Sequence, residues 1–305
     1  MSLETLIRQL ELDSRHDLLQ LHESQGMLSG LADPRLQPAV MRIAEELGLT
    51  PAVRYALARP AVATRRSGLL GSPSAHAVQL NEVLPGDALE LLDESGGYSL
   101  VRALADDYLG WLPPGAVVPG TYEATHTVTA LRAHAFAGPR VQAVKLLELS
   151  WGTQLRVVGQ PAGDFSQVLL PDSQTAFVYT AALTEGIPEP VTDISEAARS
   201  LLHAPYVWGG NTAWGLDCSG LTQLVHAMAG RQLPRDSDEQ FAAGERIELE
   251  DAQVGDAVCY RGHIGVIVGP ETMVHATATG MRVREEHVFV REGLREAYLG
   301  TVRFG

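Results

Sequence analysis

Cys218 stands at a point in the sequence where a thiol can act as a nucleophile. Apolar residues at helical spacing follow the segment Asp217-Cys218-Ser219-Gly220; they are Leu221, Leu224, Val225 and Met228. This pattern places Cys218 in the first turn of a helix. A thiol there faces unpaired backbone N–H groups and the positive end of the helix dipole, so we predict that its thiolate is favoured. A thiolate is the nucleophile that acyl transfer requires.

Two histidines downstream of Cys218 lie in otherwise apolar strands. The pattern of apolar residues predicts a hairpin over residues 255–260 and 263–269, whose second strand begins at His263. It also predicts a third strand, over residues 272–277, that contains His275. Adjacent strands would bring the two imidazoles side by side, so that His263 serves as the base and His275 fixes its tautomer. The same three side chains are zinc-type ligands, but their spacing gives no support for a metal site. We therefore expect no metal and no cofactor.

The elements that must position these residues follow a linker at residues 185–190, which contains two prolines and a glycine. Residues 193–204 predict a helix capped by Asp193 or Ser195. A glycine-rich loop over residues 206–211 then leads to the nucleophile. The acidic pair Glu285-Glu286 is predicted to lie in a solvated turn.

An internal repeat with an offset of 66 residues precedes the linker. Matching pairs include Glu82 with Glu148, Gly86 with Gly152, and Leu89 with Leu155. Short apolar runs broken by glycine, proline and aspartate predict two small β-barrels, over residues 59–120 and 121–185. Residues 1–58 contain apolar residues at helical spacing and predict a short helical N-terminal segment.

Composition excludes several classes of protein. The 305 residues carry 37 acidic and 23 basic side chains, a net charge of −14, which excludes the basic surface that nucleic acids and anionic membranes require. No run of about 18 apolar residues is present, so we expect no membrane insertion. The first ten residues lack the pattern of a signal peptide. We therefore expect a cytoplasmic protein, or one exported by a route that the sequence does not reveal.

Residues 193–305 resemble the NlpC family of bacterial cell-wall cysteine peptidases. The resemblance rests on Tyr206-Val207-Trp208-Gly209-Gly210, Asp217-Cys218-Ser219-Gly220-Leu221, His263-Ile264-Gly265-Val266 and His275. It implies an α+β fold, with a papain-like catalytic domain preceded here by two SH3-like domains and the helical segment. The first repeat resembles bacterial SH3-like domains in residues 86–91, 98–101 and 110–112, and the second has Ala176-Phe177-Val178 in place of the terminal Gly-Trp motif.

The resemblance implies roles for individual residues. Cys218 would be the nucleophile, His263 the base and later the acid, and His275 the orienting residue. The Tyr206 hydroxyl would help to hold the oxyanion, together with the backbone N–H of Cys218.

The two SH3-like domains narrow the resemblance to γ-D-glutamyl-L-diamino acid endopeptidases, which take peptides with a free N-terminal L-alanine. In that group, positions matching Asp217, Ser219 and Ser237 contact the alanine ammonium and the glutamate carboxylate. The first SH3-like domain supplies a tyrosine, matched here by Tyr108, and an acid, for which Glu82 is the nearest candidate. The usual acidic position is uncharged in this sequence.

We therefore expect a cysteine endopeptidase that hydrolyses the γ-D-glutamyl–diamino acid bond of peptidoglycan-derived peptides, as in cell-wall turnover or recycling. Soluble muropeptides with a free N-terminal L-alanine are the expected substrates. Two alternatives remain open: an amidase or acyl transferase on the same cysteine–histidine fold, and a cell-wall binding protein with a silent peptidase domain.

Overall fold

The computed structural model describes residues 2–305 and begins with a small unit of mixed structure. Helix α1 (Leu3–Gln9) begins after Ser2, whose side chain accepts a hydrogen bond from the Thr5 N–H. A three-stranded sheet is formed by β1 (Leu19–Ser24), β2 (Met27–Ala32) and β3 (Thr50–Tyr55). Helix α2 (Gln37–Leu47) connects the parallel strands β2 and β3 and covers the sheet.

Residues 1–58 are expected from their sequence to form a helical segment. This expectation is wrong for residues 19–24, 27–32 and 50–55, which form strands. The apolar residues Leu19 and Leu21 also fit a strand, because they alternate with polar residues and so share one face. Gln25 and Gly26 join β1 to β2 and both have positive φ angles, 51° and 76°. A two-residue hairpin requires this backbone conformation, and the Gln-Gly pair is the signal that helical spacing obscured.

The two repeats fold as seven-stranded sheets with the same strand order. The first has the order β10-β4-β7-β8-β9-β5-β6, and the second has the equivalent order, β17-β11-β14-β15-β16-β12-β13. The strands of the first are β4 (Arg59–Ala63), β5 (Ser67–Leu70), β6 (Gln79–Val83), β7 (Ala88–Ser95), β8 (Tyr98–Ala103), β9 (Leu109–Leu112) and β10 (Val117–Pro119). Those of the second are β11 (His126–Val128), β12 (Arg132–Phe136), β13 (Lys145–Ser150), β14 (Gln154–Val157), β15 (Phe165–Leu169), β16 (Thr175–Tyr179) and β17 (Leu183–Glu185).

Matched residues of the repeats have matched environments, which confirms the repeat at the level of the fold. Leu89 and Leu155 are both completely buried in their respective cores. Gly86 and Gly152 precede them in turns with φ angles of 92° and 86°, a conformation that favours glycine.

Among its described residues, the C-terminal domain combines a six-stranded sheet, of order β20-β25-β21-β22-β23-β24, with four α-helices and a 3-10 helix (Leu249–Asp251). Its α-helices are α3 (Ile194–Ser200), α4 (Cys218–Met228), α5 (Ser237–Ala243) and α6 (Glu292–Ala297). Its strands are β18 (Asn211–Thr212), β19 (Gly215–Leu216), β20 (Glu245–Ile247), β21 (Ala257–Tyr260), β22 (His263–Gly269), β23 (Thr272–Thr277), β24 (Arg282–His287) and β25 (Tyr298–Arg303). Helices α3 and α4 pack on the sheet through an apolar core that includes Leu221, Val225, Val266 and Val274.

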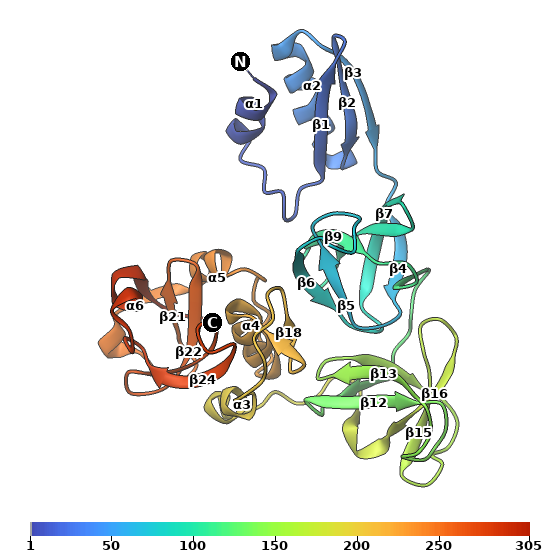
Figure 1. Cartoon of the computed structure of the whole chain (residues 1–305), viewed down its shortest axis with the longest axis vertical. Helices are drawn as coiled ribbons and strands as arrows, with labels where there is room; N and C mark the ends of the chain where they lie inside the picture. Colours follow the sequence, from blue (N-terminus) through green and yellow to red (C-terminus); the bar gives the residue numbers. More distant parts are fainter. Residues whose placement is uncertain (1) are drawn as a thin grey trace.

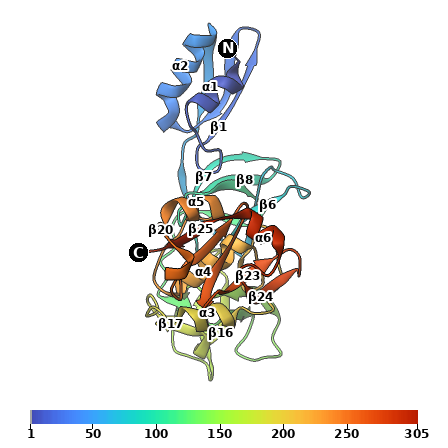
Figure 2. The same cartoon turned by 90° about the vertical axis from the view of Figure 1, so that its left-hand side faces the viewer.

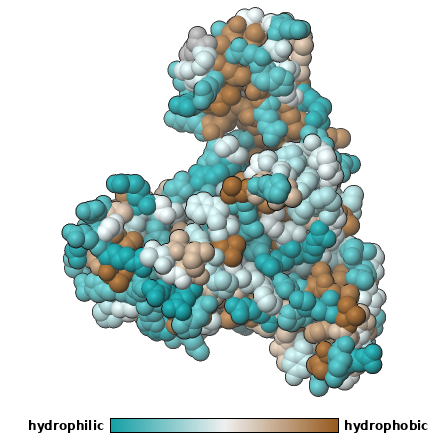
Figure 3. All heavy atoms as spheres, in the orientation of Figure 1, coloured by the Kyte–Doolittle hydropathy of each residue, from teal (hydrophilic) through white to brown (hydrophobic). Residues whose placement is uncertain are grey.

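The first SH3-like domain contacts all of the other units (Figure 1). The N-terminal unit lies at one end of the molecule, and its α1–β1 loop extends toward the C-terminal domain. The sheet of the C-terminal domain faces the viewer in Figure 2. Figure 3 shows hydrophobic residues in patches on the N-terminal unit and on the second SH3-like domain. Among residues 2–305, no helix is both long and apolar enough to span a bilayer.

An apolar cluster and a buried ion pair fix the N-terminal unit to the first SH3-like domain. Leu18 and Leu31 pack against Leu100 and Trp111. Beside them, the Arg102 guanidinium, only 4% exposed, donates to the Asp33 carboxylate at 2.7 Å. The α1–β1 loop is held beside this pair, because the Leu109 N–H donates to the Arg15 carbonyl oxygen at 2.7 Å and Arg102 donates to that of His16 at 3.5 Å.

Candidate active site

Cys218 is the first residue of α4, as its sequence context predicts. Asp217 caps this helix, since its carboxylate accepts a hydrogen bond from the Gly220 N–H at 2.7 Å. Gly220 is required here, because a β-carbon would lie 2.2 Å from the carbonyl oxygen of Gly210. The tight packing of α4 against the preceding loop thus fixes the position of the nucleophile.

The prediction that the thiolate is favoured in the resting protein is wrong. Burial, with the Asp217 charge adding to it, raises the pKa of Cys218 to about 11. The backbone N–H groups of Ser219 and Ile264 lower the pKa of this thiol, as does Arg235, but burial outweighs them. Cys218 therefore needs a base to take its proton during attack.

His263 and His275 lie on adjacent strands and contact each other, as predicted. The Nε2 atom of His263 is 2.7 Å from the Nδ1 atom of His275. The Nε2 atom of His275 is in turn 3.2 Å from a carboxylate oxygen of Glu286 on β24. Glu286 is only 15% exposed in its side chain and also pairs with Arg284, so the prediction that it lies in a solvated turn is wrong.

This chain of hydrogen bonds assigns the tautomers of both imidazoles. Because the Glu286 carboxylate can only accept, His275 donates from Nε2 and its Nδ1 accepts the proton of His263 Nε2. The Nδ1 atom of His263 is then left without a proton and can take one from a thiol. Burial, with the nearby His275 and Arg291, lowers the pKa of His263 to about 3, so that this ring is neutral near pH 7.

Tyr206 precedes the loop that leads to Cys218. Burial raises its pKa to about 12, so its hydroxyl remains protonated and can donate a hydrogen bond to an oxyanion. Gly209 of the same loop has a φ angle of 73° and contacts the first SH3-like domain, where a β-carbon would lie 2.8 Å from the Gln79 carbonyl oxygen. The glycine-rich loop thus follows from a close domain contact.

Most of the predicted site residues line a pocket of about 230 Å³ beside the Cys218 thiol. It is lined by both domains: Leu80, Tyr108, Tyr206, Trp208, Asp217, Cys218, Ser219, Asp236, Ser237, Asp238 and Gly262. His263 follows Gly262 directly, and the Cys218 thiol is close to the N–H of the next residue, Ile264. The pocket is therefore a cleft that ends at the first SH3-like domain.

Asp217 and Ser219 line this pocket but are already held by the protein. Both Asp217 carboxylate oxygens accept from the Arg235 guanidinium, at 2.7 and 3.0 Å. The Ser219 hydroxyl donates to Asp217 and accepts from Arg235. Arg235 therefore compensates the charge of Asp217 within the C-terminal domain.

Tyr108 reaches the pocket from the first SH3-like domain, and its hydroxyl donates to the Asp236 carboxylate at 3.1 Å. Arg15, from the α1–β1 loop, donates to the same oxygen at 3.0 Å and to Asp238 at 2.8 Å. His16 of this loop lies 2.7 Å from Glu239. The N-terminal unit thus supports the rim of the cleft, a contact that no pattern in the sequence indicates.

Glu82, the predicted acid of the substrate site, does not line the cleft. Its carboxylate is buried between Arg66 and the Thr212 hydroxyl, which donates to it at 3.0 Å. Burial raises the pKa of Glu82, and Arg66 and Thr212 partly oppose this. Glu82 connects domains, because the part of strand β6 that carries it contacts β18, whereas Leu80, two residues earlier on this strand, lines the cleft. Asp236 is the acid that accompanies Tyr108, and sequence reasoning missed it.

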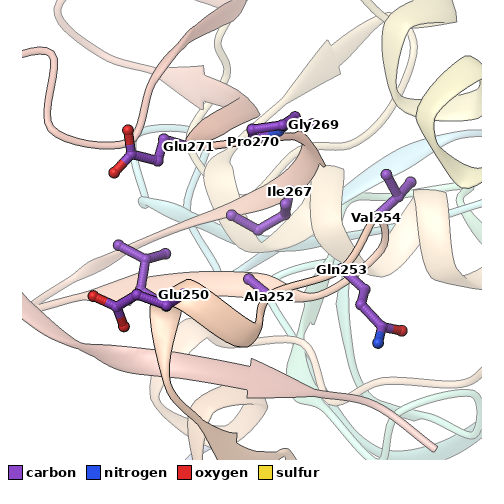
Figure 4. A pocket seen from close by; sticks show the side chains of 9 residues that line it. Glu250, Ala252, Gln253, Val254, Ile267, Gly269, Pro270 and Glu271 are labelled. Atoms are coloured by element: carbon purple, nitrogen blue, oxygen red, sulfur yellow. The ribbon is translucent and has the colours of Figure 1, made fainter.

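A second pocket, of about 470 Å³, lies on the C-terminal domain (Figure 4). Its labelled side chains include Glu250, Gln253 and Glu271 around the apolar Ile267. None of the nine described residues that line it is a cysteine or a histidine. Cys259 is buried elsewhere in the domain core, where burial raises its pKa to about 12. Cys218 is therefore the thiol suited to chemistry.

Comparison with protein families assigns two segments of the chain. Residues 203–302 match the NlpC/P60 family, and residues 69–117 match the bacterial dipeptidyl-peptidase SH3 domain. The chain is 26% identical to a gamma-D-glutamyl-L-lysine dipeptidyl-peptidase of Bacillus cereus, over 73% of this chain and 74% of that protein. It is 25% identical to dipeptidyl-peptidase 6 of Lysinibacillus sphaericus, over 75% of this chain and 93% of that protein.

The fold is also found in a solved structure. A crystal structure of an NlpC/P60 family protein from Bacillus cereus superposes with a TM-score of 0.70 at 22% identity, covering 80% of this chain and 99% of that one. The two proteins therefore share a fold over most of this chain.

Proposed function

From the match of residues 203–302 to the NlpC/P60 family, we propose that this chain is a cysteine endopeptidase acting on the γ-D-glutamyl–diamino acid bond of peptidoglycan stem peptides. One observation carries the proposal. Cys218 shares a small cleft with Tyr206 of its own domain and Tyr108 of the first SH3-like domain. The name of the Bacillus cereus relative, a gamma-D-glutamyl-L-lysine dipeptidyl-peptidase, supports the same substrate class.

The first half of the reaction forms a thioester. The Cys218 thiol gives its proton to Nδ1 of His263 as its sulfur attacks the γ-carbonyl carbon of D-glutamate. The oxyanion accepts hydrogen bonds from the Cys218 backbone N–H and the Tyr206 hydroxyl. The C–N bond then breaks, and His263 returns the proton to the departing amine of the diamino acid.

The second half of the reaction is hydrolysis. Water attacks the thioester carbon while His263 takes one of its protons, and the C–S bond breaks. The proton then passes to the sulfur, which restores the thiol and releases the acyl dipeptide. His275 and Glu286 hold the His263 ring throughout and offset the positive charge that it acquires.

We further propose that the substrate carries a free N-terminal amino group, as a soluble muropeptide does once its glycan is removed. Asp236, held by Tyr108 and Arg15, is the acid that supports this recognition at the end of the cleft. A charge-assisted hydrogen bond to a carboxylate is lost when the amine is acylated. The small volume of the cleft also favours a short peptide over crosslinked wall.

The test is digestion of L-Ala-γ-D-Glu-meso-diaminopimelate by the wild type and by Cys218→Ala, followed by mass spectrometry. We expect the wild type alone to release L-Ala-γ-D-Glu. An N-acetylated copy of the peptide should be cleaved much more slowly. No cleavage of either peptide, with Cys218 still open to alkylation, would refute the endopeptidase and favour acyl transfer to another acceptor.

A further inference from the structure

Arg235 is a completely buried arginine that organises the start of the nucleophile helix. Its Nη atoms donate to both carboxylate oxygens of Asp217 and to the Ser219 hydroxyl, all within 3.0 Å. Asp217 also accepts from the backbone N–H groups of Gly209 and Gly220. Arg235 therefore holds the residue that fixes both the glycine-rich loop and the first turn of α4.

Arg235 also donates to a residue outside the C-terminal domain. Its Nε atom donates to Oδ1 of Asn81, on strand β6 of the first SH3-like domain, at 2.8 Å. Asn81 is 1% exposed, and its Nδ2 group donates to Asp106 at 2.8 Å. Its Oδ1 atom also accepts from Asn211 at 3.2 Å. Because both ends of this amide are engaged, its oxygen is held toward Arg235.

We infer that Arg235 and Asn81 are positioning residues that set the orientation of the Cys218 side chain. The inference rests on the proposed function only for the identity of the nucleophile. Arg235 fixes two oxygens of one carboxylate and a hydroxyl at once, which a point charge cannot do. A small displacement of α4 would misalign the sulfur with the carbonyl carbon, and such errors cost large factors in rate.

Charge gives a second effect that can be measured separately from geometry. Asp217 disfavours the Cys218 thiolate and Arg235 favours it. Removing the guanidinium leaves the Asp217 charge uncompensated beside the thiol. Arg235→Lys retains the positive charge but lacks the planar guanidinium that binds both Asp217 oxygens at once. This variant should therefore separate the reactivity of the thiol from turnover of the substrate.

The experiment compares Arg235→Met, Arg235→Lys and Asn81→Ala in the full chain. The first measurement is the rate of alkylation of Cys218 by iodoacetamide at pH 8.5, with the site located by peptide mapping. The second is kcat and KM on L-Ala-γ-D-Glu-meso-diaminopimelate. Arg132→Ala is the matched control, since it removes an arginine contact of the second SH3-like domain to Ala213 that does not involve Asp217. Circular dichroism checks that each variant is folded.

We expect Arg235→Met to slow alkylation by about tenfold, which corresponds to a rise of about one unit in the pKa of the thiol. Arg235→Lys should keep most of the alkylation rate but lose about 10- to 100-fold in kcat, with KM nearly unchanged. Asn81→Ala should lose about fivefold in kcat, again with little change in KM. Arg132→Ala should resemble the wild type.

Wild-type kcat in folded Arg235→Lys and Asn81→Ala would overturn the inference. If Arg235→Met does not fold, these two variants still decide the question. Failure of the proposed function looks different: the wild type would not cleave the peptide, whereas the alkylation rates would still separate Arg235→Met from Arg235→Lys. Equal alkylation rates in these two variants and the wild type would refute the charge effect.

Discussion

Tyr108 and Asp236 belong to different domains, yet the tyrosine hydroxyl donates to the carboxylate at 3.1 Å inside the cleft. This hydrogen bond orients an acid that Arg15, from a third unit, supports from the other side. The proposed recognition site is thus assembled from three parts of the chain, and the variants below separate their contributions.

Asp236→Asn should weaken recognition of the free amino group without affecting the chemical step. We expect KM for the free tripeptide to rise about tenfold, as for loss of one charge-assisted hydrogen bond, with kcat nearly unchanged. Slow cleavage of the N-acetylated peptide should be unaffected. Glu250→Gln, the same type of change in the pocket of Figure 4, is the control. An equal rise in KM for both peptides would contradict the assignment.

Glu286→Gln should lower kcat through the histidine pair. An amide can donate to His275 Nε2 as well as accept from it, so the tautomer that leaves His263 Nδ1 free is no longer enforced. We expect a loss of about 10- to 100-fold in kcat with KM unchanged. Glu285→Gln is the matched control, because the Glu285 side chain pairs with Arg199 on the surface. Equal activity of the two variants would show that Glu286 does not orient His275.

The dependence of activity on pH should reflect the burial of the histidine base. The pKa of His263 is lowered to about 3, so its ring stays neutral where an ordinary imidazole becomes protonated. We expect kcat/KM for the tripeptide to change little between pH 8 and pH 6 on account of His263. The measurement is kcat/KM in a pH series from 4.5 to 8.5. A fall of kcat/KM to half of its maximum near pH 6.5 would contradict this expectation.

The same lowered pKa makes a prediction for stability. The unfolded chain takes up a proton at His263 near pH 6.5, whereas the folded chain does so only near pH 3. The free energy of unfolding that His263 contributes must therefore fall as the pH falls from about 6.5 to about 3. Urea titrations at pH 7 and pH 5 should show that the free energy of unfolding falls less between these two pH values in His263→Asn than in the wild type.

Asp33→Ala should destabilise the junction between the N-terminal unit and the first SH3-like domain. It leaves the Arg102 guanidinium with less compensation in a site that is only 4% exposed, which costs about 3 kcal/mol. Arg35→Ala removes the exposed partner of the same carboxylate and should cost less than about 1 kcal/mol. Thermal unfolding of the two variants provides the comparison. Equal melting temperatures would mean that the buried pair does not stabilise the junction.

The nucleophile and the histidine pair could be predicted because both follow from local rules. A helix start after Asp217 and the pairing of neighbouring strands are properties of short segments. Asp236, Arg235 and Glu286 could not be assigned in the same way. Their partners are Tyr108, Asn81 and His275, which lie on other elements, so their roles depend on the packing of domains and of strand β24.

The secondary structure of the N-terminal unit could not be predicted from apolar spacing alone. Its leucines fit both a helix and a strand, and the turn at Gln25 and Gly26 decided between them. The thiol pKa was mispredicted for a related reason. The favourable helix start at Cys218 is a local feature, whereas the burial that outweighs it is created by the whole domain.

The duplication also has a consequence for how this chain was built. Arg66 of the first copy donates to Glu148 of the second at 3.1 Å, and the residue 66 positions after it, Arg132, donates to Ala213 of the C-terminal domain at 2.9 Å. Each copy thus holds its C-terminal neighbour with the same arginine. A repeat that carries its own contact to the next domain can be added to a chain without a new kind of junction between domains.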